Sequence, residues 1–238
     1  RCADRETTEE REVNEEKDKA LTRFIGDVSR HQLTVIRENG LYRHLRFKRF
    51  GSSAYWFDLV TWPGYLCVTG DMGTWTFSRI EDMFDFFTDA HFGRRESLLI
   101  NPGYWSEKFE AGAGRGRRES PCFEFDARRF DKGLQEWLDA YLQDCDNAEQ
   151  AEEAKEAINE LKGNDYTTES DAYHAFDGVF FPSGVSTYDI MEGLGNLQTY
   201  SHHYLWVCYA IVWGIERYRT APLVDRAVST FLAVRQTN

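Results

Sequence analysis

The chain lacks cysteine pairs at metal-binding spacing, long apolar runs and an excess of basic charge. Its five cysteines are an odd number and include no C-x-x-C pair. This usage fits free thiols in a reducing cytosol better than a disulfide framework or a zinc site. The cysteines are Cys2, Cys67, Cys122, Cys145 and Cys208.

Hydrophobic runs in the chain are short. The longest, at 204–215, spans about twelve residues, whereas a helix needs about 20 to cross a bilayer. The first twenty residues are dominated by charged side chains, so we expect no signal peptide among them. These features predict an intracellular protein without a membrane segment.

Acidic residues outnumber basic ones, with 40 Asp and Glu against 28 Lys and Arg, for a net charge of −12 and a pI near 5.0. A general nucleic-acid binder would carry a basic surface, so this class is disfavoured. An acidic surface repels phosphate backbones, and it can also imitate them. Aromatic residues make up 15% of the chain, a high share that favours rigid cores and contact surfaces.

The period of the sequence changes at His31, where strand-like segments begin. Asn39-Gly40 is a strong type I′ hairpin signal, and further short turns separate the segments that follow. In the segment 41–49 apolar and polar residues alternate, apart from Arg43, which we expect at a strand edge or beside a bulge. The pattern predicts an antiparallel meander of five strands. Its strands are expected at 32–38, 41–49, 54–60, 65–69 and 74–78.

Apolar residues at helical spacing predict helices on both sides of this sheet. A charged N-terminal helix is expected over residues 1–29, with its second half docked, and a short capping helix over 80–89. Further helices are expected at 126–144, 148–162, 169–176, 188–194, 197–217 and 224–235. The predicted fold class is therefore α+β, a five-stranded antiparallel meander with a capping helix followed by a mostly helical C-terminal half.

The predicted organisation has four segments. The Gly/Arg-rich loop at 112–120 is the expected internal boundary, because its glycines favour a flexible connection. Whether the helical region beyond it forms one domain with the sheet or a second domain stays open. The segments are the N-terminal helix at 1–29, the sheet region at 30–111, the loop at 112–120 and the helical region at 121–238.

Charge is segregated along the chain. Residues 37–49 hold five basic side chains and one acid, and the glycine-rich loop adds three arginines, whereas residues 131–160 hold ten acids and two lysines. One interpretation is a basic sheet face for a polyanion and an acidic helical face for a basic protein. The other is two solvated faces whose charges partly pair within the fold. The candidate binding residues are Arg43, Arg46, Lys48, Arg115, Arg117, Arg118, Asp139, Asp144, Glu152 and Glu153.

Motifs of the common catalytic classes are missing. The glycine-rich loop continues with Arg117-Arg118-Glu119 instead of the Lys-Ser/Thr of a phosphate-binding loop, and there is no G-x-S-x-G elbow. The adjacent His202 and His203 would point about 100° apart on a helix, which suits a shared metal ion poorly. We therefore expect no catalytic residues, no metal site and no cofactor.

Two features admit both a structural and a functional interpretation. Asp58 lies within a strand, where it either acts as a catalytic carboxylate or, as we favour, pairs with Arg46 or Lys48 on the neighbouring strand. The aromatic-rich helix at 197–217 either stacks on bases or a cofactor or, as we favour, is a buried core helix with aromatic flanks.

Several runs of the sequence are distinctive. They are WFDLVTWPG at 56–64, GDMG at 70–73, FSR at 77–79, DMFDFF at 82–87 and INPGYWSEK at 100–108. With these runs the chain resembles a family of uncharacterised proteins encoded by bacteriophages and prophages. The resemblance covers roughly residues 30–110, extends more weakly to 206–215, and brings no known catalytic residues. It implies a small phage accessory protein that acts in the cytoplasm of an infected host cell.

We expect a phage protein that binds and inhibits a host nucleic-acid-handling or defence complex, such as a CRISPR-type complex, without catalysis. Its partner would be a host protein or nucleoprotein complex and not a membrane, and any direct contact with nucleic acid would use the basic sheet face. Two alternatives stay open. One is a metal-dependent or phosphate-binding enzyme that acts on nucleotides or nucleic acid, and the other is a phage structural or assembly protein.

Overall fold

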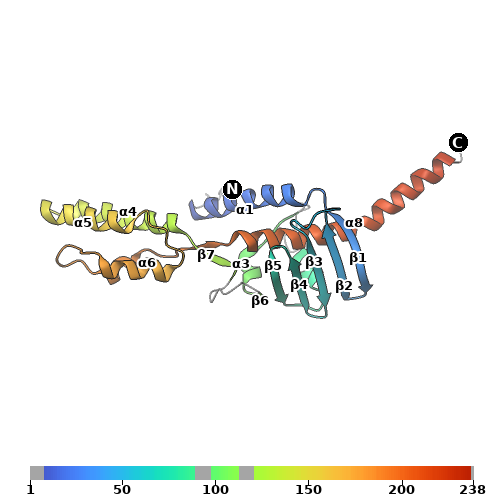
Figure 1. Cartoon of the computed structure of the whole chain (residues 1–238), viewed down its shortest axis with the longest axis horizontal. Coiled ribbons are helices and arrows are strands. Elements are labelled where there is room, and N and C mark those ends of the chain that lie inside the picture. The colour runs from blue at the N-terminus through green and yellow to red at the C-terminus, as the bar shows by residue number, and fades with distance from the viewer. Residues whose placement is uncertain (1–7, 89–97, 113–120, 237–238) are drawn as a thin grey trace, which may run out of the picture. The chain divides into compact units, whose positions relative to one another are not determined.

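The computed structural model describes residues 8–88, 98–112 and 121–236 (Figure 1). Its fold is α+β, as the sequence predicts: a helix, a six-stranded antiparallel sheet and a mostly helical C-terminal half. The chain divides into two compact units. We call residues 1–122 together with 201–238 the sheet unit, and residues 123–200 the helical unit.

The strands of the large sheet lie in sequence order, and each is antiparallel to the next. The first five form the predicted meander, and Gly40 in its first turn has a φ of +61°. Residues with a Cβ atom are strained at such a φ, which explains the glycine at this hairpin. Because Asn39 pairs with Tyr42, the two loop residues are Gly40 and Leu41, and the type I′ turn predicted with Asn39 and Gly40 at its centre is not the one formed. The short sixth strand has no counterpart in the sequence prediction. The strands are β1 (Gln32–Asn39), β2 (Tyr42–Lys48), β3 (Phe57–Trp62), β4 (Tyr65–Gly70), β5 (Gly73–Ser78) and β6 (Phe109–Gly112).

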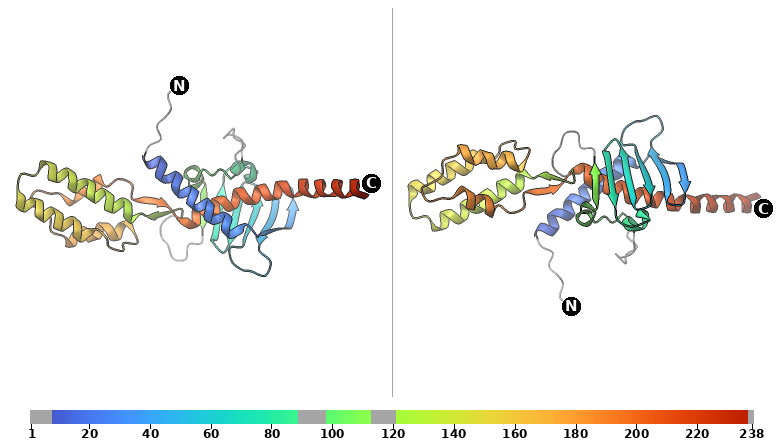
Figure 2. Two further views of the ribbon diagram at one scale, coloured as in Figure 1. Left: turned by 90° about the horizontal axis from the view of Figure 1, so that it is seen from above. Right: turned by 90° about the horizontal axis from the view of Figure 1, so that it is seen from below.

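One face of this sheet is apolar, and helix α8 (His202–Gln236) lies across it (Figure 2). The buried side chains of this face are Leu45, Phe47, Phe57, Leu59, Leu66, Val68, Trp75 and Phe77. The helix can approach closely at Gly214, because a Cβ atom there would lie only 2.7 Å from Cδ1 of Leu59. Helix α1 (Thr8–Val28) packs on α8 in turn, with Phe24 edge-on to Trp206 at 5.1 Å between ring centroids. The interpretation of the aromatic-rich helix as a core helix is confirmed.

Helix α8 continues through Pro222 to Gln236, so the structure joins two helices predicted separately at 197–217 and 224–235. Proline removes one helical hydrogen bond and usually ends or kinks a helix, which is why the sequence suggests a break there. Among the helices that the structure describes, none has the length and apolar character needed to cross a membrane.

Two short helices, α2 (Met83–Thr88) and α3 (Pro102–Ser106), extend the apolar core beyond β5. The capping helix predicted at 80–89 corresponds to α2. Its Phe87 lies edge-on to Phe77 of β5 at 5.5 Å and to Trp105 of α3 at 4.8 Å between ring centroids. These aromatic contacts attach both helices to the sheet.

The helical unit begins and ends in a two-stranded antiparallel ribbon, β7 paired with β8. Between these strands the helices enclose a core of their own. Its fully buried residues include Phe130, Leu134, Ile158, Leu161, Ala172 and Ile190. The elements are β7 (Phe123–Phe125), α4 (Ala127–Asp144), α5 (Ala148–Leu161), α6 (Glu169–Ala175), the 3-10 turn η2 (Phe176–Gly178), α7 (Thr187–Gly193) and β8 (Gln198–Tyr200).

This division differs from the predicted organisation at the C-terminal end of the chain. The sequence groups residues 121–238 into one helical region, whereas α8 belongs to the sheet unit and only 123–200 form a separate unit. The apolar stripe of α8 indicates burial but does not specify which element covers it. Of the predicted boundary loop, residues 113–120 lie outside the described part of the chain.

Candidate functional site

The face of the large sheet that points away from α8 carries polar side chains, and we call it the polar face. The strand register arranges its residues in rows that cross β1 to β5. One row contains Thr34, Arg46, Asp58, Thr69 and Thr74, and the next contains Arg37, His44, Val60, Cys67 and Thr76. Towards the β3–β4 turn, the rings of Trp62 and Tyr65 stack with centroids 5.2 Å apart. Basic, aromatic and hydroxyl groups therefore share one surface.

Asp58 is the central group of the polar face, with only 3% of its surface exposed. Arg46 donates two hydrogen bonds to its carboxylate, from Nε at 2.9 Å and Nη2 at 2.8 Å, and His44 Nε2 donates a third at 2.7 Å. Burial by itself would raise the pKa of Asp58, but the bonds from Arg46 and His44 outweigh it and hold the pKa below its usual value. The predicted Asp58–Arg46 pair is confirmed, and the carboxylate stays ionised.

His44 is a member of this cluster that the sequence did not single out. Its Nε2 must carry the proton, because the carboxylate of Asp58 can only accept. A signal was present, since His44 and Arg46 alternate on the same face of β2. The register that brings both side chains to one acid on β3 is a property of strand pairing, which the sequence does not specify.

Arg43 lies on the opposite face of the sheet from Arg46 and Lys48. It donates two hydrogen bonds of 2.8 Å to the carboxylate of Asp82, and its guanidinium lies over the ring of Phe84, 4.5 Å from the centroid. Only 13% of its side chain is exposed. As predicted, it stands beside a bulge, the register shift between Val35 and Arg37 of β1. Its contacts make it a tie between β2 and α2.

The candidate basic residues therefore do not form a single group. Arg46 and Lys48 share the polar face, and Arg46 is already bonded to Asp58. Arg43 is part of the opposite face. The other three candidates, Arg115, Arg117 and Arg118, lie outside the described residues.

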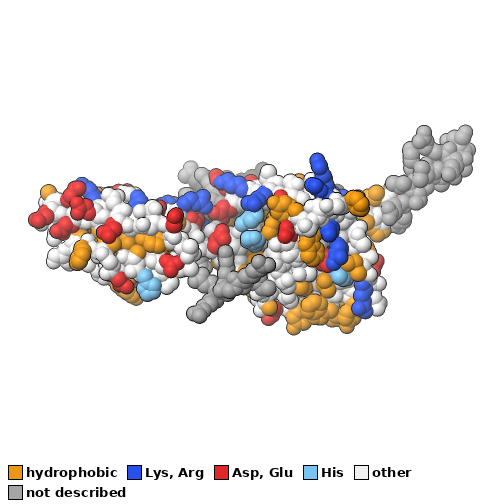
Figure 3. Space-filling model, in the orientation of Figure 1, with side chains coloured by type: hydrophobic (Ala, Val, Ile, Leu, Met, Phe, Trp, Pro, Cys, Tyr) orange, Lys and Arg blue, Asp and Glu red, His pale blue; other side chains and the backbone are white. Residues whose placement is uncertain are grey.

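The acidic charge of the chain is concentrated in the helical unit. Residues 123–200 hold 18 Asp and Glu against five Lys and Arg, a net charge of −13. The whole chain carries −12, so the residues of the sheet unit sum to +1. In Figure 3 acidic side chains are visible over α4 and α5. The segregation seen along the sequence thus coincides with the boundary between two folded units.

The four candidate acids all lie in the antiparallel pair formed by α4 and α5, and all four are exposed. Asp139 accepts a hydrogen bond from Gln135 at 2.8 Å, and Glu152 pairs with Lys155 at 3.1 Å. Asp144 is the last residue of α4, and Glu153 lies in the second turn of α5. The structure places these acids on one hairpin of helices.

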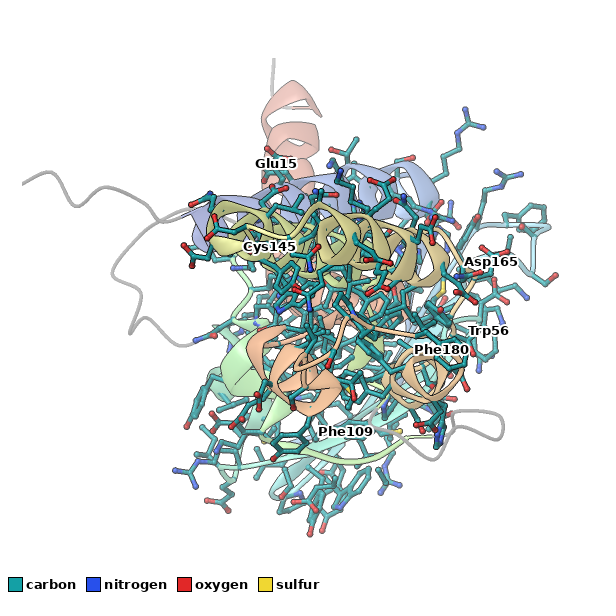
Figure 4. The ribbon with its side chains drawn as sticks, turned by 90° about the vertical axis from the view of Figure 1, so that its left-hand side faces the viewer. Glu15, Trp56, Phe109, Cys145, Asp165 and Phe180 are labelled. Atoms are coloured by element: carbon teal, nitrogen blue, oxygen red, sulfur yellow. The ribbon has the colours of Figure 1, made fainter. Side chains whose placement is uncertain are left out.

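A shallow pocket of about 540 Å³ opens where α4 turns into α5. Its lining residues are Trp137, Ala140, Tyr141, Asp144, Cys145, Asp146, Asn147 and Gln150. Figure 4 labels Cys145 at this turn and, apart from it, Phe180 on the segment after α6. Trp137 and Tyr141 are partly buried against the core of the helical unit and also line this pocket.

No group of three or more His, Cys, Asp or Glu side chains converges as metal ligands within the part of the chain that the structure describes. Comparison of the chain with protein-family models, with curated proteins and with solved structures finds no match in any of the three.

Proposed function

We propose that the protein is a non-catalytic phage accessory protein whose helical unit binds a basic, nucleic-acid-binding surface of a host complex, such as a CRISPR-type defence complex, and inhibits it. The observation that carries this proposal is the charge partition: −13 on residues 123–200 and +1 on the rest of the chain. A compact body with this charge competes with a phosphate backbone for lysine and arginine side chains.

Exposed aromatic residues of the helical unit supply contact anchors beside the charge. Phe180 is 93% exposed and Tyr188 is 67% exposed, although both are large and partly apolar. Aromatic residues dominate the energetics of many protein interfaces, because they bury much area at small entropic cost. The exposed aromatic rings on this acidic surface therefore favour contact with a protein partner.

The setting of the proposed function is the cytoplasm of an infected cell. It follows from the resemblance of residues 30–110 to phage- and prophage-encoded proteins. Electrostatic recognition of this kind weakens steeply with salt, so binding should fall between about 50 and 200 mM salt.

The test is competition for nucleic acid. A labelled DNA or RNA is bound to a CRISPR-type complex of the host, and the protein is added at increasing concentration. We expect displacement by the natural protein and loss of displacement in a variant with Asp139→Asn, Asp144→Asn, Glu152→Gln and Glu153→Gln. The matched control removes four exposed acids of the sheet unit, Glu15→Gln, Glu81→Gln, Glu107→Gln and Glu110→Gln. Equal loss in both variants, or no displacement by the natural protein, would overturn the proposal.

A second pair of matched variants tests the exposed aromatic residues. Phe180→Ala in the helical unit should weaken displacement, whereas Phe50→Ala in the sheet unit should not. Phe50 is 92% exposed, so the two substitutions remove equally solvated rings and neither affects a core. If Phe50→Ala is the more damaging change, the binding surface lies on the sheet unit instead.

A second candidate is an enzyme that acts on nucleotides or nucleic acid at the polar face. The observation that favours it is the Asp58–His44 hydrogen bond, because a buried carboxylate that orients an imidazole is a common general-base arrangement. Arg46 and Lys48 on the same face would contact phosphate groups. A screen for turnover of nucleotides and nucleic acids, with and without divalent metal, tests it. Turnover that persists in Asp58→Asn and His44→Gln would contradict it.

A further inference from the structure

We infer that the pocket at the α4–α5 turn binds the guanidinium group of an arginine side chain presented by the partner. This inference rests on the proposed function, since it names the chemistry by which the helical unit holds a basic surface. The pocket measures about 540 Å³, within the range of ordinary ligand sites.

Aromatic rings form one wall of the pocket. Trp137 and Tyr141 lie one helical turn apart on α4, and their rings stack at 5.2 Å between centroids with an interplanar angle of 16°. Phe181 contacts Trp137 edge-on, with centroids 6.0 Å apart, and so supports the orientation of the indole. Guanidinium groups stack on aromatic faces, and tryptophan gives the strongest attraction of the three aromatic residues.

Carboxylates form the rim. Asp144 and Asp146 are exposed, and within the described residues neither forms an ion pair. Two other acids of the same unit do have a basic partner, Glu152 in Lys155 and Asp126 in Arg129, so their charge is partly compensated. A carboxylate accepts two hydrogen bonds from a guanidinium at once, which is stronger and more specific than contact with an ammonium.

The ends of the two helices favour a cation over an anion. Helix α4 ends at Asp144 with no basic residue in its last turn, so the negative end of its dipole lies beside the pocket without a cation of its own. The first amides of α5 would attract an anion, but the side chain of Asn147 already accepts hydrogen bonds from Glu149 and Gln150. With a net charge of −13 on the unit, a positive side chain is the ligand that fits.

The experiment uses the full chain, labelled with ¹⁵N, and three blocked tripeptides: Gly-Arg-Gly, the same peptide with lysine, and the same peptide with citrulline. Trp137 is the only tryptophan of residues 123–200, so its indole signal, assigned with a Trp137→Phe variant, reports on the pocket. We expect a saturable shift of this signal with the arginine peptide, a weaker one with lysine and none with the neutral citrulline.

Variants separate the pocket from general charge attraction. Asp144→Asn with Asp146→Asn should weaken arginine binding about tenfold, the effect of losing a charge-assisted bond. Glu156→Gln with Glu160→Gln removes the same charge at exposed acids of α5 outside the pocket and should leave binding within about twofold. Equal weakening by both pairs of substitutions, or equal binding of the citrulline peptide, would overturn the inference.

The proposed function would survive that result, since displacement of nucleic acid can arise from the whole acidic surface. Conversely, arginine binding without displacement would uphold the pocket and refute the proposed function.

Discussion

Asp58 shows how one side chain organises the polar face of the sheet. Its carboxylate is almost fully buried, yet it remains charged because Arg46 and His44 donate three hydrogen bonds to it. Removing one partner of such a cluster leaves the others with unmet charge, which costs more than the cluster contributes when intact. Substitution of Asp58 should therefore destabilise the fold, although this residue lies on the polar face.

Asp58→Asn should lower the free energy of unfolding by about 2 kcal/mol, less than a fully buried pair loses, because Arg46 is 42% exposed and can be hydrated. Urea denaturation measures this change. Asp85→Asn is the control, since Asp85 also pairs with an arginine, Arg219, but is 62% exposed. We expect Asp85→Asn to lower the free energy of unfolding by less than about 0.5 kcal/mol. A decrease as large as that of Asp58→Asn would contradict the role of burial.

Two histidines, the buried His31 and the partly buried His202, should make the protein less stable in mild acid. Burial lowers the pKa of both His31 and His202, and among the described residues Nδ1 of His31 and Nε2 of His202 have no hydrogen-bond partner. In the unfolded chain the pKa is near 6.5, so below that pH the unfolded state binds more protons than the folded state. Stability is complete above pH 6.5 and is lost as the pH falls towards the lower folded-state values.

Each histidine contributes a slope of at most about 1.4 kcal/mol per pH unit. Denaturation curves recorded between pH 7 and 5 measure the slope, and the variant His31→Gln with His202→Gln should flatten it. Replacing the exposed His174 in the same way should leave the slope unchanged, because its side chain is 79% exposed. A slope that survives the loss of both His31 and His202 would contradict this account.

At the scale of elements, the contact between α8 and the sheet depends on a glycine. A Cβ atom at Gly214 would lie 2.7 Å from Leu59 Cδ1 and 3.1 Å from a ring atom of Phe47, and both side chains are fully buried. Gly214→Val should therefore lower the free energy of unfolding by about 2 kcal/mol through overpacking. Gly26→Val in α1 meets no atom within 4 Å and should change it by less than about 0.5 kcal/mol. Thermal or urea denaturation of the two variants checks the difference, and similar losses would contradict tight packing at Gly214.

The meander was predictable because its signals are local. Asn39-Gly40 marks the place of the first hairpin, although its loop residues are Gly40 and Leu41. Alternation along β2 specifies which face is buried, including the exceptional place of Arg43. The Asp58–Arg46 pair followed from the same reasoning, since neighbouring strands bring such side chains together. The strand register that also brings His44 to Asp58 cannot be derived from such local patterns.

The features that the sequence did not predict depend on contacts between distant segments. The buried stripe of α8 could have packed on the other helices, and only the structure shows it on the sheet. Strand β6 is four residues long and pairs with β5 across a register shift, so its own sequence carries little signal. The pocket beside Trp137 exists because α4 and α5 meet at Asn147, which periodicity along one helix cannot reveal.

At the scale of the whole molecule, the helical unit is an insertion between two parts of the sheet unit. The points where the chain leaves and re-enters the sheet unit are adjacent, since the amide of Ser201 donates to the carbonyl of Cys122 at 2.9 Å. Each unit has its own core. Joining Cys122 to Ser201 through a short glycine linker should therefore leave a folded sheet unit, checked by a cooperative unfolding transition and dispersed amide signals. A molten or unfolded product would show that the cores depend on each other.

The same deletion provides the most direct test of the central claim, that the helical unit competes with nucleic acid for a basic host surface. The measurement is displacement of labelled nucleic acid from the host complex by the full chain and by the folded chain without residues 123–200, at low and at raised salt. The account predicts displacement by the full chain that weakens with salt, and none by the shortened chain. Displacement by the shortened chain as strong as that by the full chain would contradict it.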